Sequence, residues 1–174
     1  LWLAPADDAS APPGRTVVRL HMGVAFGTGR HATTALCLEW LEENTASGST
    51  LLDYGCGSGV LALAALALGA SSAWAVDNDA QALLATRANA ALNGVVERLH
   101  VVAPESLPAV AVDVLAANIL AGPLVMLAPE LVACVRPGAR VVLSGILEAQ
   151  AARVASAYAA YCHDIEQTAR DGWV

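Results

Sequence analysis

Lysine is absent from this 174-residue chain, and charge of either sign is scarce. The nine Lys or Arg positions are therefore all arginine, against sixteen acidic residues, and charged residues make up 14% of the chain. A disordered chain is rich in charge and poor in apolar residues, so a hydrophobic fraction of 56% excludes that class. The formal net charge of -7 argues against broad electrostatic binding to phosphate backbones, and we expect no direct nucleic-acid binding.

Long apolar runs and a secretory leader are missing as well. The longest helix-like apolar run, residues 60–70, is far shorter than the roughly 20 residues that a membrane span needs. No basic-then-apolar leader is visible, so we expect a cytoplasmic protein without membrane association. Cysteines are few and form no C-x-x-C pair, so we expect reduced thiols and no metal site. A disulfide between two of them is the alternative. The cysteines are Cys37, Cys56, Cys134 and Cys162.

Short apolar segments alternate with helical patterns beyond a Pro- and Ala-rich start. Residues 1–14 show no period and predict a linker or irregular lead-in. Pro129 predicts a late start or a kink in the fourth helix, and Pro137-Gly138 predicts a turn before the strand that follows. The predicted helices are 31–44, 58–68, 79–92, 124–135 and 147–161, and the predicted strands are 16–20, 50–54, 73–76, 95–102, 112–116, 140–143 and 165–168, with another beginning at 173–174.

This alternation of strands and helices is typical of βαβ units. It predicts an α/β domain over residues 15–174, with a doubly wound, mostly parallel Rossmann-like sheet and helices on both faces. An open sheet of this kind would use the segment at 173–174 as a strand, so we expect the last strand to be cut short.

A glycine-rich motif, Asp53-Tyr54-Gly55-Cys56-Gly57-Ser58-Gly59, lies at a predicted strand-to-helix turn. Glycines at such a turn allow a ligand to approach the backbone closely. The spacing is G-x-G-x-G, whereas a dinucleotide pyrophosphate needs G-x-G-x-x-G. The motif therefore fits a ligand without phosphates, and by itself it equally fits a plain glycine turn.

An acidic residue follows the next predicted strand. Asp77 lies about 20 residues past the glycine turn, where a carboxylate can hold a ribose diol through two hydrogen bonds. Because Asp77, Asn78 and Asp79 also precede a helix, an N-cap is the alternative role. We assign helix capping to Asp79 and ribose binding to Asp77.

Two further segments carry polar side chains toward the same predicted edge. Asn118 follows the strand at 112–116, and its side-chain carbonyl could accept hydrogen bonds from an amine, although an Asx turn would explain it too. The segment 25–34 reads as a flexible loop that leads into a helix. Its hydroxyl groups and His31 could close over a ligand, or His31 could be solvent-exposed.

Together these motifs resemble class I S-adenosylmethionine-dependent methyltransferases, and specifically the PrmA family, which methylates large-subunit ribosomal protein eleven. The resemblance extends from about Gly23 to Gln150, and its AFGTG-x-H-x-TT segment is specific, because generic methyltransferases lack it. The matching segments are AFGTGRHATT, LLDYGCGSGVLALAALALGA, VDNDAQALLATRANAALNGV, ANILAGPL and LSGIL.

The resemblance implies S-adenosyl-L-methionine as cofactor and methyl transfer to Lys side chains or the N-terminal amine of a large-subunit ribosomal protein, which would be the partner. It implies a catalytic, orienting role for Asn118. The cofactor-binding residues that it implies are Thr34, Gly55, Asp77 and Asn118, with Phe26, Gly27, His31 and Gly57 as further lining.

The chain departs from the family pattern in two ways. His21-Met22-Gly23 stands where the family usually has Asp-Pro-Gly, and the family's N-terminal substrate-recognition domain is not seen. We therefore expect the catalytic domain at 15–174, with residues 1–14 as the end of an interdomain connection.

Other readings of the motifs remain. The enzyme could be an S-adenosylmethionine-dependent N-methyltransferase of another protein, a small molecule or a nucleic acid, although ANIL lacks the two prolines and the aromatic residue that stack a flat substrate. A nicotinamide-dependent dehydrogenase is disfavoured by the glycine spacing and by the absence of any lysine. The domain could also bind the cofactor without catalysis.

Overall fold

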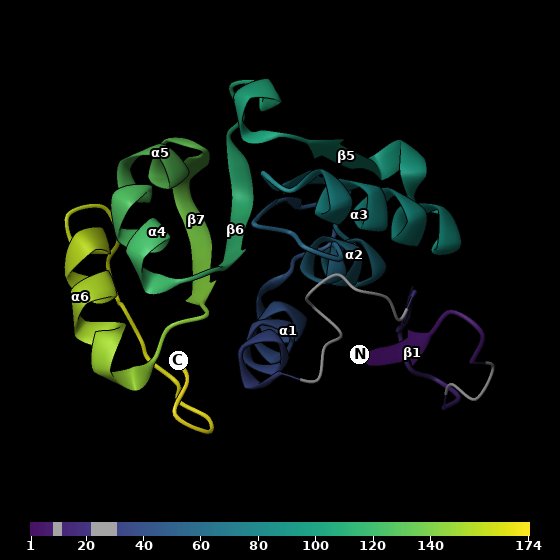
Figure 1. Cartoon of the computed structure of the whole chain (residues 1–174), viewed down its shortest axis with the longest axis horizontal. Helices are drawn as coiled ribbons and strands as arrows, with labels where there is room; N and C mark the ends of the chain where they lie inside the picture. The colour runs from purple at the N-terminus through teal and green to yellow at the C-terminus, as the bar shows by residue number, and fades with distance from the viewer. Residues whose placement is uncertain (9–11, 22–30) are drawn as a thin grey trace.

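Five parallel strands form the central sheet of the computed structural model, which describes residues 1–8, 12–21 and 31–174 (Figure 1). Their order across the sheet is β5-β4-β3-β6-β7. The chain adds β4 and β5 on one side of β3 and then crosses over to add β6 and β7 on its other side, so the strand order switches between β3 and β6. Open α/β sheets bind ligands beyond the strand carboxyl ends at such a switch point. The strands are β3 (Thr50–Tyr54), β4 (Ser72–Val76), β5 (Leu99–Val102), β6 (Val112–Asn118) and β7 (Val135–Ser144).

Helices cover both faces of this sheet, which confirms the predicted doubly wound α/β class (Figure 1). The first three helices share one apolar core with Leu51 of β3, and the last three share the other with Leu52. Consecutive strand residues point to opposite faces, so each central strand serves both cores. The helices are α1 (Ala32–Asn44), α2 (Val60–Ala67), α3 (Ala80–Leu92), α4 (Ala121–Met126), α5 (Ala128–Ala133) and α6 (Glu148–Tyr158), with short 3-10 turns η1 (Val96–Arg98) and η2 (Pro104–Ser106).

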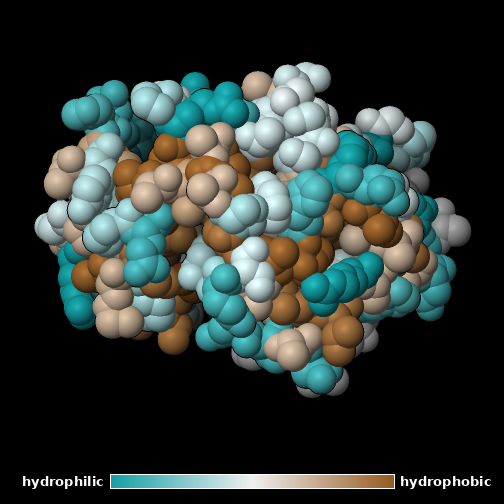
Figure 2. Space-filling model, turned by 90° about the horizontal axis from the view of Figure 1, so that it is seen from above, coloured by the Kyte–Doolittle hydropathy of each residue, from teal (hydrophilic) through white to brown (hydrophobic). Residues whose placement is uncertain are grey.

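The helix that follows the glycine motif is apolar all round. Residues 60–66 of α2 are all buried, as expected for a helix enclosed on every side. Its alanines allow the neighbouring helix and strands to approach closely. At the surface, by contrast, apolar side chains gather in separate areas with hydrophilic residues between and around them (Figure 2). No helix in the described part of the chain is long and apolar enough to cross a membrane.

The start of the chain differs from the prediction of an irregular lead-in. Residues Trp2–Pro5 form strand β1, which pairs in parallel with β2 (Val17–Leu20), the strand predicted at 16–20. Four residues that include a proline carry too little pattern to signal a strand. The pairing partner lies beyond the turn, and burial of Ala4, Val18 and Leu20 supplies the stabilisation.

Two proline predictions had different outcomes. The helical pattern at 124–135 does break, since α4 ends at Met126 and Pro129 lies in the first turn of α5. The turn predicted at Pro137-Gly138 is wrong, because β7 runs through it. The ladder with β6 shifts register there, from Val112 opposite Val135 to Val114 opposite Arg140, and a bulge tolerates proline because the ladder hydrogen bond is already lost.

The strand predictions at the far end are wrong. Residues 165–168 form no strand, and Trp173 makes only isolated antiparallel bridges to Leu147 and Arg170. Residues 165–168 are all exposed, so no apolar face holds them against the sheet. The strand predicted at 95–102 is also shorter, because residues 96–98 form η1 before β5 begins at Leu99.

Candidate functional site

The glycine motif forms the loop between β3 and α2, as predicted. Gly55, Gly57 and Gly59 all have positive φ angles, of 79°, 54° and 78°. The backbone amides of Gly55 and Cys56 donate to the Val76 carbonyl at 2.7 and 3.0 Å, which ties the loop to the end of β4. Such φ angles are accessible to glycine without strain, so this backbone path explains the residue type at all three positions.

Close packing gives a second reason for two of these glycines. A Cβ on Gly55 would lie 2.2 Å from Cγ2 of Ile119, and one on Gly59 would lie 2.7 Å from Cγ2 of Thr86. The loop is therefore pressed against the segment after β6 and against α3. The glycines therefore serve the packing of the protein itself, and the close ligand approach that the sequence suggested stays a prediction.

Asp77 leaves the end of β4 with both carboxylate oxygens anchored. Oδ2 accepts from the Gly57 amide at 2.9 Å, and Oδ1 accepts from the Asp79 amide at 2.9 Å. Asp79 caps α3 by accepting from the Gln81 amide at 2.9 Å, which confirms its predicted capping role. Each Asp77 oxygen keeps lone-pair capacity, and the residue is only half-buried, so it can accept hydrogen bonds from two neighbouring hydroxyls.

Asn118 and Thr34 meet across the molecule. Asn118 ends β6, and its Nδ2 donates to Oγ1 of Thr34 at 3.3 Å. Thr34 lies in the first turn of α1 and is 3% exposed. The amide nitrogen only donates, so the side-chain carbonyl is the acceptor group of Asn118, and its role toward an amine stays a prediction.

His31 has a structural role that the sequence did not show. It is the N-cap of α1, and its Nδ1 lies 2.9 Å from Oγ1 of Thr33 and accepts from the Thr33 amide at 3.4 Å. Its ring stands edge-on to Trp173, with centroids 5.0 Å apart. Its role as ligand lining stays a prediction, and Phe26 and Gly27 lie outside the described residues.

Two buried polar residues of α3 also hold the glycine loop, and the sequence analysis missed them. Thr86 donates from Oγ1 to the Gly57 carbonyl at 3.0 Å, and Asn89 donates from Nδ2 to the Ser58 carbonyl at 2.9 Å. Asn89 also accepts from the His21 amide at 2.8 Å, so one side chain joins the loop to the end of β2. Their signal was available: polar residues three apart on the inward face of an alanine-rich helix predict specific buried partners.

Asp53 lies buried behind the loop, with a single hydrogen bond. Its Oδ2 accepts from the Ala62 amide at 3.1 Å, while Oδ1 has no partner among the described residues. Burial raises the pKa of this carboxyl to about 7; the Ala62 amide opposes the shift and nearby Asp77 adds to it. The group is therefore a buried acid that is close to its titration point at neutral pH.

Asp53 should make stability depend on pH. Because its pKa in the folded protein is about 7, above the ordinary 3.8, the folded state keeps a proton that the unfolded chain releases. Stability from this group is full below pH 4 and falls as pH rises to 7, by on the order of 4 kcal/mol. Urea unfolding at pH 4, 5.5 and 7 should show this fall in the parent and its loss in Asp53→Asn. The variant Asp7→Asn, at an exposed position, should behave as the parent. If the free energy of unfolding depends on pH to the same extent in all three proteins, the assignment to Asp53 is contradicted.

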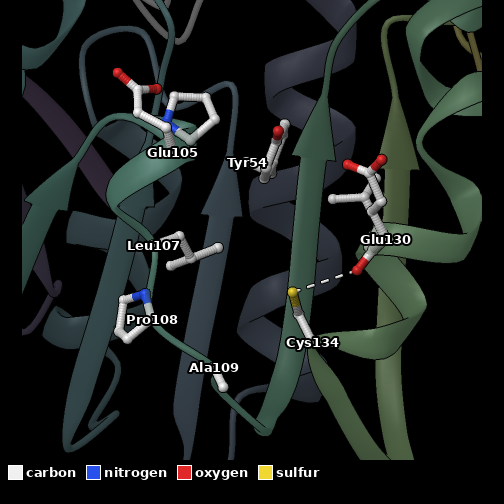
Figure 3. A pocket seen from close by; sticks show the side chains of 9 residues that line it. Tyr54, Glu105, Leu107, Pro108, Ala109, Glu130 and Cys134 are labelled. Atoms are coloured by element: carbon white, nitrogen blue, oxygen red, sulfur yellow. Dashed lines mark hydrogen bonds between the residues drawn. The ribbon is translucent and has the colours of Figure 1, made fainter.

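A cavity of about 420 Å³ lies near this edge, and a second cavity of about 920 Å³ lies elsewhere in the molecule. Thr34, Gly55, Asp77 and Asn118 line neither cavity, but Tyr54, which precedes Gly55, lines the smaller one (Figure 3). Within the residues that the structure describes, no group of His, Cys, Asp or Glu side chains is arranged to hold a metal ion. Among the described residues, the site consists of anchored backbone and polar side chains at the carboxyl edge of the sheet.

Comparison with known proteins connects this site to one family. The whole chain, residues 1–174, matches the family described as ribosomal protein L11 methyltransferase (PrmA). The ribosomal protein L11 methyltransferase of Pseudomonas putida (strain W619) is 52% identical over 175 residues, which cover 100% of this chain and 60% of that protein. The chain thus spans three fifths of the length of this relative.

Solved structures agree with the fold. A crystal structure of ribosomal protein L11 methylase from Lactobacillus delbrueckii subsp. bulgaricus has a TM-score of 0.87 and 32% identity, over 98% of this chain and 90% of that one. An RNA methyltransferase from Salinibacter ruber, in complex with S-adenosyl-L-homocysteine, shares the fold alone. Its TM-score is 0.55 at 20% identity, over 64% of this chain and 73% of that one.

Proposed function

This chain belongs to the ribosomal protein L11 methyltransferase family, and on that premise we propose that it binds S-adenosyl-L-methionine and methylates amino groups of a large-subunit ribosomal protein. The acceptors are Lys side chains, the N-terminal amine or both. One observation carries the proposal: Gly57, Asp77 and the Asn118–Thr34 pair stand at the carboxyl ends of β3, β4 and β6, around the switch point of the sheet.

The proposal also covers the organisation and setting of the chain. Residues 15–174 form the methyltransferase domain, and residues 1–14, including β1, form the end of a connection to a substrate-recognition domain. Four free cysteines fit a reducing compartment, so the activity is assigned to the cytoplasm. The net charge of -7 disfavours direct nucleic-acid contact.

The side chains and backbone at this edge fit the cofactor. Asp77 accepts the two ribose hydroxyls, because its oxygens are already fixed at 2.9 Å from two amides and keep lone-pair capacity. The loop from Gly55 to Gly59 offers backbone groups, with the Gly57 amide held at 2.9 Å from Oδ2 of Asp77. Thr34 and Asn118 lie near the reacting end, and His31, Phe26 and Gly27 are assigned as further lining.

When bound, S-adenosyl-L-methionine supplies an electrophilic methyl group on a sulfonium sulfur. The residues of this chain must hold a neutral amine in line with that methyl carbon. A lysine with its ordinary pKa lies roughly 3 units above neutral pH, so its deprotonation costs about 4 kcal/mol, and desolvation in a cleft reduces this. Asn118 accepts an N–H of the neutral amine at Oδ1 and so directs the lone pair, while Thr34 fixes the orientation of its amide.

Asn118→Ala should reduce turnover more than it weakens cofactor binding. Loss of one hydrogen bond to the reacting amine should lower kcat by about 10- to 100-fold, while the Kd for S-adenosylmethionine changes by about 3-fold or less. Single-turnover methyl transfer and calorimetry measure the two effects. Asn44→Ala, at the far end of α1, is the matched control and should change neither. A raised Kd with an unchanged rate of the saturated complex would contradict the orienting role.

Calorimetry and mass spectrometry together test the function. The chain should bind S-adenosylmethionine and not NAD, and labelled methyl groups should appear on amines of purified ribosomal protein L11. Binding of NAD alone would overturn the methyltransferase assignment. The chain could instead bind the cofactor and methylate another protein, a small molecule or a nucleic acid, but not L11. That result would support the methyltransferase assignment and overturn the proposed substrate.

A further inference from the structure

One residue of the glycine loop, Gly57, is held by two different elements. Its amide donates to Oδ2 of Asp77, after β4, at 2.9 Å, and its carbonyl accepts from Oγ1 of Thr86, on α3, at 3.0 Å. Glycine has more backbone freedom than any other residue, and the φ of Gly57 is 54°, in the left-handed region. Hydrogen bonds from outside the loop therefore fix the direction in which the Gly57 amide points.

The Thr86 hydroxyl is itself oriented by the loop. Thr86 is 0% exposed, and Sγ of Cys56 lies 3.4 Å from its Oγ1. A hydroxyl has one proton, and since that of Thr86 goes to the Gly57 carbonyl, the Cys56 thiol is the donor in this contact. Burial raises the pKa of the Cys56 thiol and nearby Asp53 raises it further, so the proton stays on sulfur. A chain of hydrogen bonds thus runs from Cys56 through Thr86 and Gly57 to Asp77.

Thr86 differs from Asn89, the other α3 residue that holds the loop, in what it contacts. Asn89 bonds the Ser58 carbonyl and the His21 amide, so it joins the loop to the end of β2. The two side-chain hydrogen bonds that the structure gives Thr86 are to Cys56 and to Gly57, both in the loop. Removal of the Thr86 hydroxyl therefore releases the loop alone, whereas removal of the Asn89 amide would release β2 as well.

We propose that Thr86 is a positioning residue for the cofactor. Because it is fully buried, it acts through Gly57: its hydroxyl fixes the residue whose amide holds Oδ2 of Asp77, and so orients the carboxylate that we assign to the ribose. A carboxylate that is oriented before binding loses less freedom when the ribose hydroxyls dock, which raises affinity. The inference rests on the proposed function, because it assigns Thr86 a part in binding that same cofactor.

Two substitutions of Thr86 separate its hydroxyl from its methyl group. Thr86→Val keeps the shape and removes the hydroxyl, so the Kd for S-adenosylmethionine should rise about 10-fold. Thr86→Ser keeps the hydroxyl and removes the methyl group that packs on Gly59, so the Kd should stay within about 2-fold of the parent value. Both variants should be less stable in urea unfolding, so a loss of stability alone cannot produce the difference in affinity. Isothermal titration calorimetry of the folded proteins measures each Kd.

Thr50→Val is the matched control. Oγ1 of Thr50 donates to Oδ2 of Asp113 at 2.9 Å, at the amino end of β3 and so at the opposite edge of the sheet from the site. This variant loses a comparable hydroxyl, and its Kd should stay within about 2-fold of the parent value. In spectra of the ligand-free proteins, the Gly57 amide signal should move in Thr86→Val and keep its parent position in Thr86→Ser and Thr50→Val.

A double variant tests whether Thr86 acts through Asp77. In the Asp77→Ala background, Thr86→Val should change the Kd by about 2-fold or less, because the carboxylate that it orients is gone. An undiminished further loss of affinity there, equal Kd values for the Val and Ser variants, or an unmoved Gly57 amide in Thr86→Val would each overturn the positioning role while the parent still binds. Failure of the parent chain to bind S-adenosylmethionine would instead overturn the proposed function, and the inference with it.

Discussion

Asp77→Ala should raise the Kd for S-adenosylmethionine by about 100-fold or more. The change removes two acceptors proposed for the ribose, and hydrogen bonds to charged groups are each worth about 1.5–3 kcal/mol. It also releases the Gly57 amide, which Asp77 holds at 2.9 Å, so the glycine loop loses its link to the end of β4 at that point. Isothermal titration calorimetry at constant salt measures the affinity directly.

Asp79→Ala is the matched control for this prediction. Asp79 is an acid two residues further on that caps α3 through the Gln81 amide. Its loss should cost about 0.5–2 kcal/mol of stability with little change in cofactor affinity. Equal effects of the two substitutions on the Kd would mean that negative charge at this corner, and not the Asp77 carboxylate, determines binding.

Gly55→Ala should destabilise the fold by about 2–5 kcal/mol. An L residue in the left-handed region costs about 1–2 kcal/mol, and the Gly55 φ is 79°. The new Cβ would also meet Cγ2 of Ile119 at 2.2 Å. Ile119 has little room to withdraw, because its own backbone is pressed on Gly145, where a Cβ would lie 2.4 Å from the Ile119 oxygen. Overpacking of this kind adds about 1–3 kcal/mol.

Gly48→Ala separates the backbone effect from the packing effect. Its φ of 82° is similar, but a Cβ there would meet nothing within 4 Å. This variant should lose only about 1–2 kcal/mol. Urea unfolding of both variants at pH 7 measures the difference, and equal losses would show that the contact with Ile119 relaxes without cost.

The central architecture was accessible from the sequence because its signals are local. Asp79 begins a helix that Leu92 ends, and Thr50 to Tyr54 is a short apolar run before glycines. The predictions that failed concern pairings between segments that are distant in the chain. Whether residues 2–5 pair with 17–20, and whether 165–168 pair with anything, depends on neighbours that are distant in the chain. Periodicity within a window cannot report such neighbours.

The site was predictable in part for the same reason. Glycine spacing and the acid after β4 indicated the proposed cofactor half, the position of Asn118 after a strand indicated that residue, and resemblance to a family added Thr34. No local pattern indicated that these two side chains contact each other. The cavity beside Tyr54 was not predictable, since its wall comes from β3, the segment after β5 and α5. Thr86 and Asn89 could have been found from their polarity on a buried helix face.

The strand order also determines which part of the site forms first during folding. The Gly57–Asp77 contact spans 20 residues and closes within a single β3-α2-β4 unit, whereas the Asn118–Thr34 contact spans 84 residues across the centre of the sheet. Contacts of long sequence separation carry a larger loop-closure entropy and form late. The half that we propose binds the ribose can therefore exist as soon as one βαβ unit is formed. The half that we propose orients the amine exists only once the two halves of the sheet have joined. On that proposal, an opening between β3 and β6 would abolish catalysis before it abolished cofactor binding.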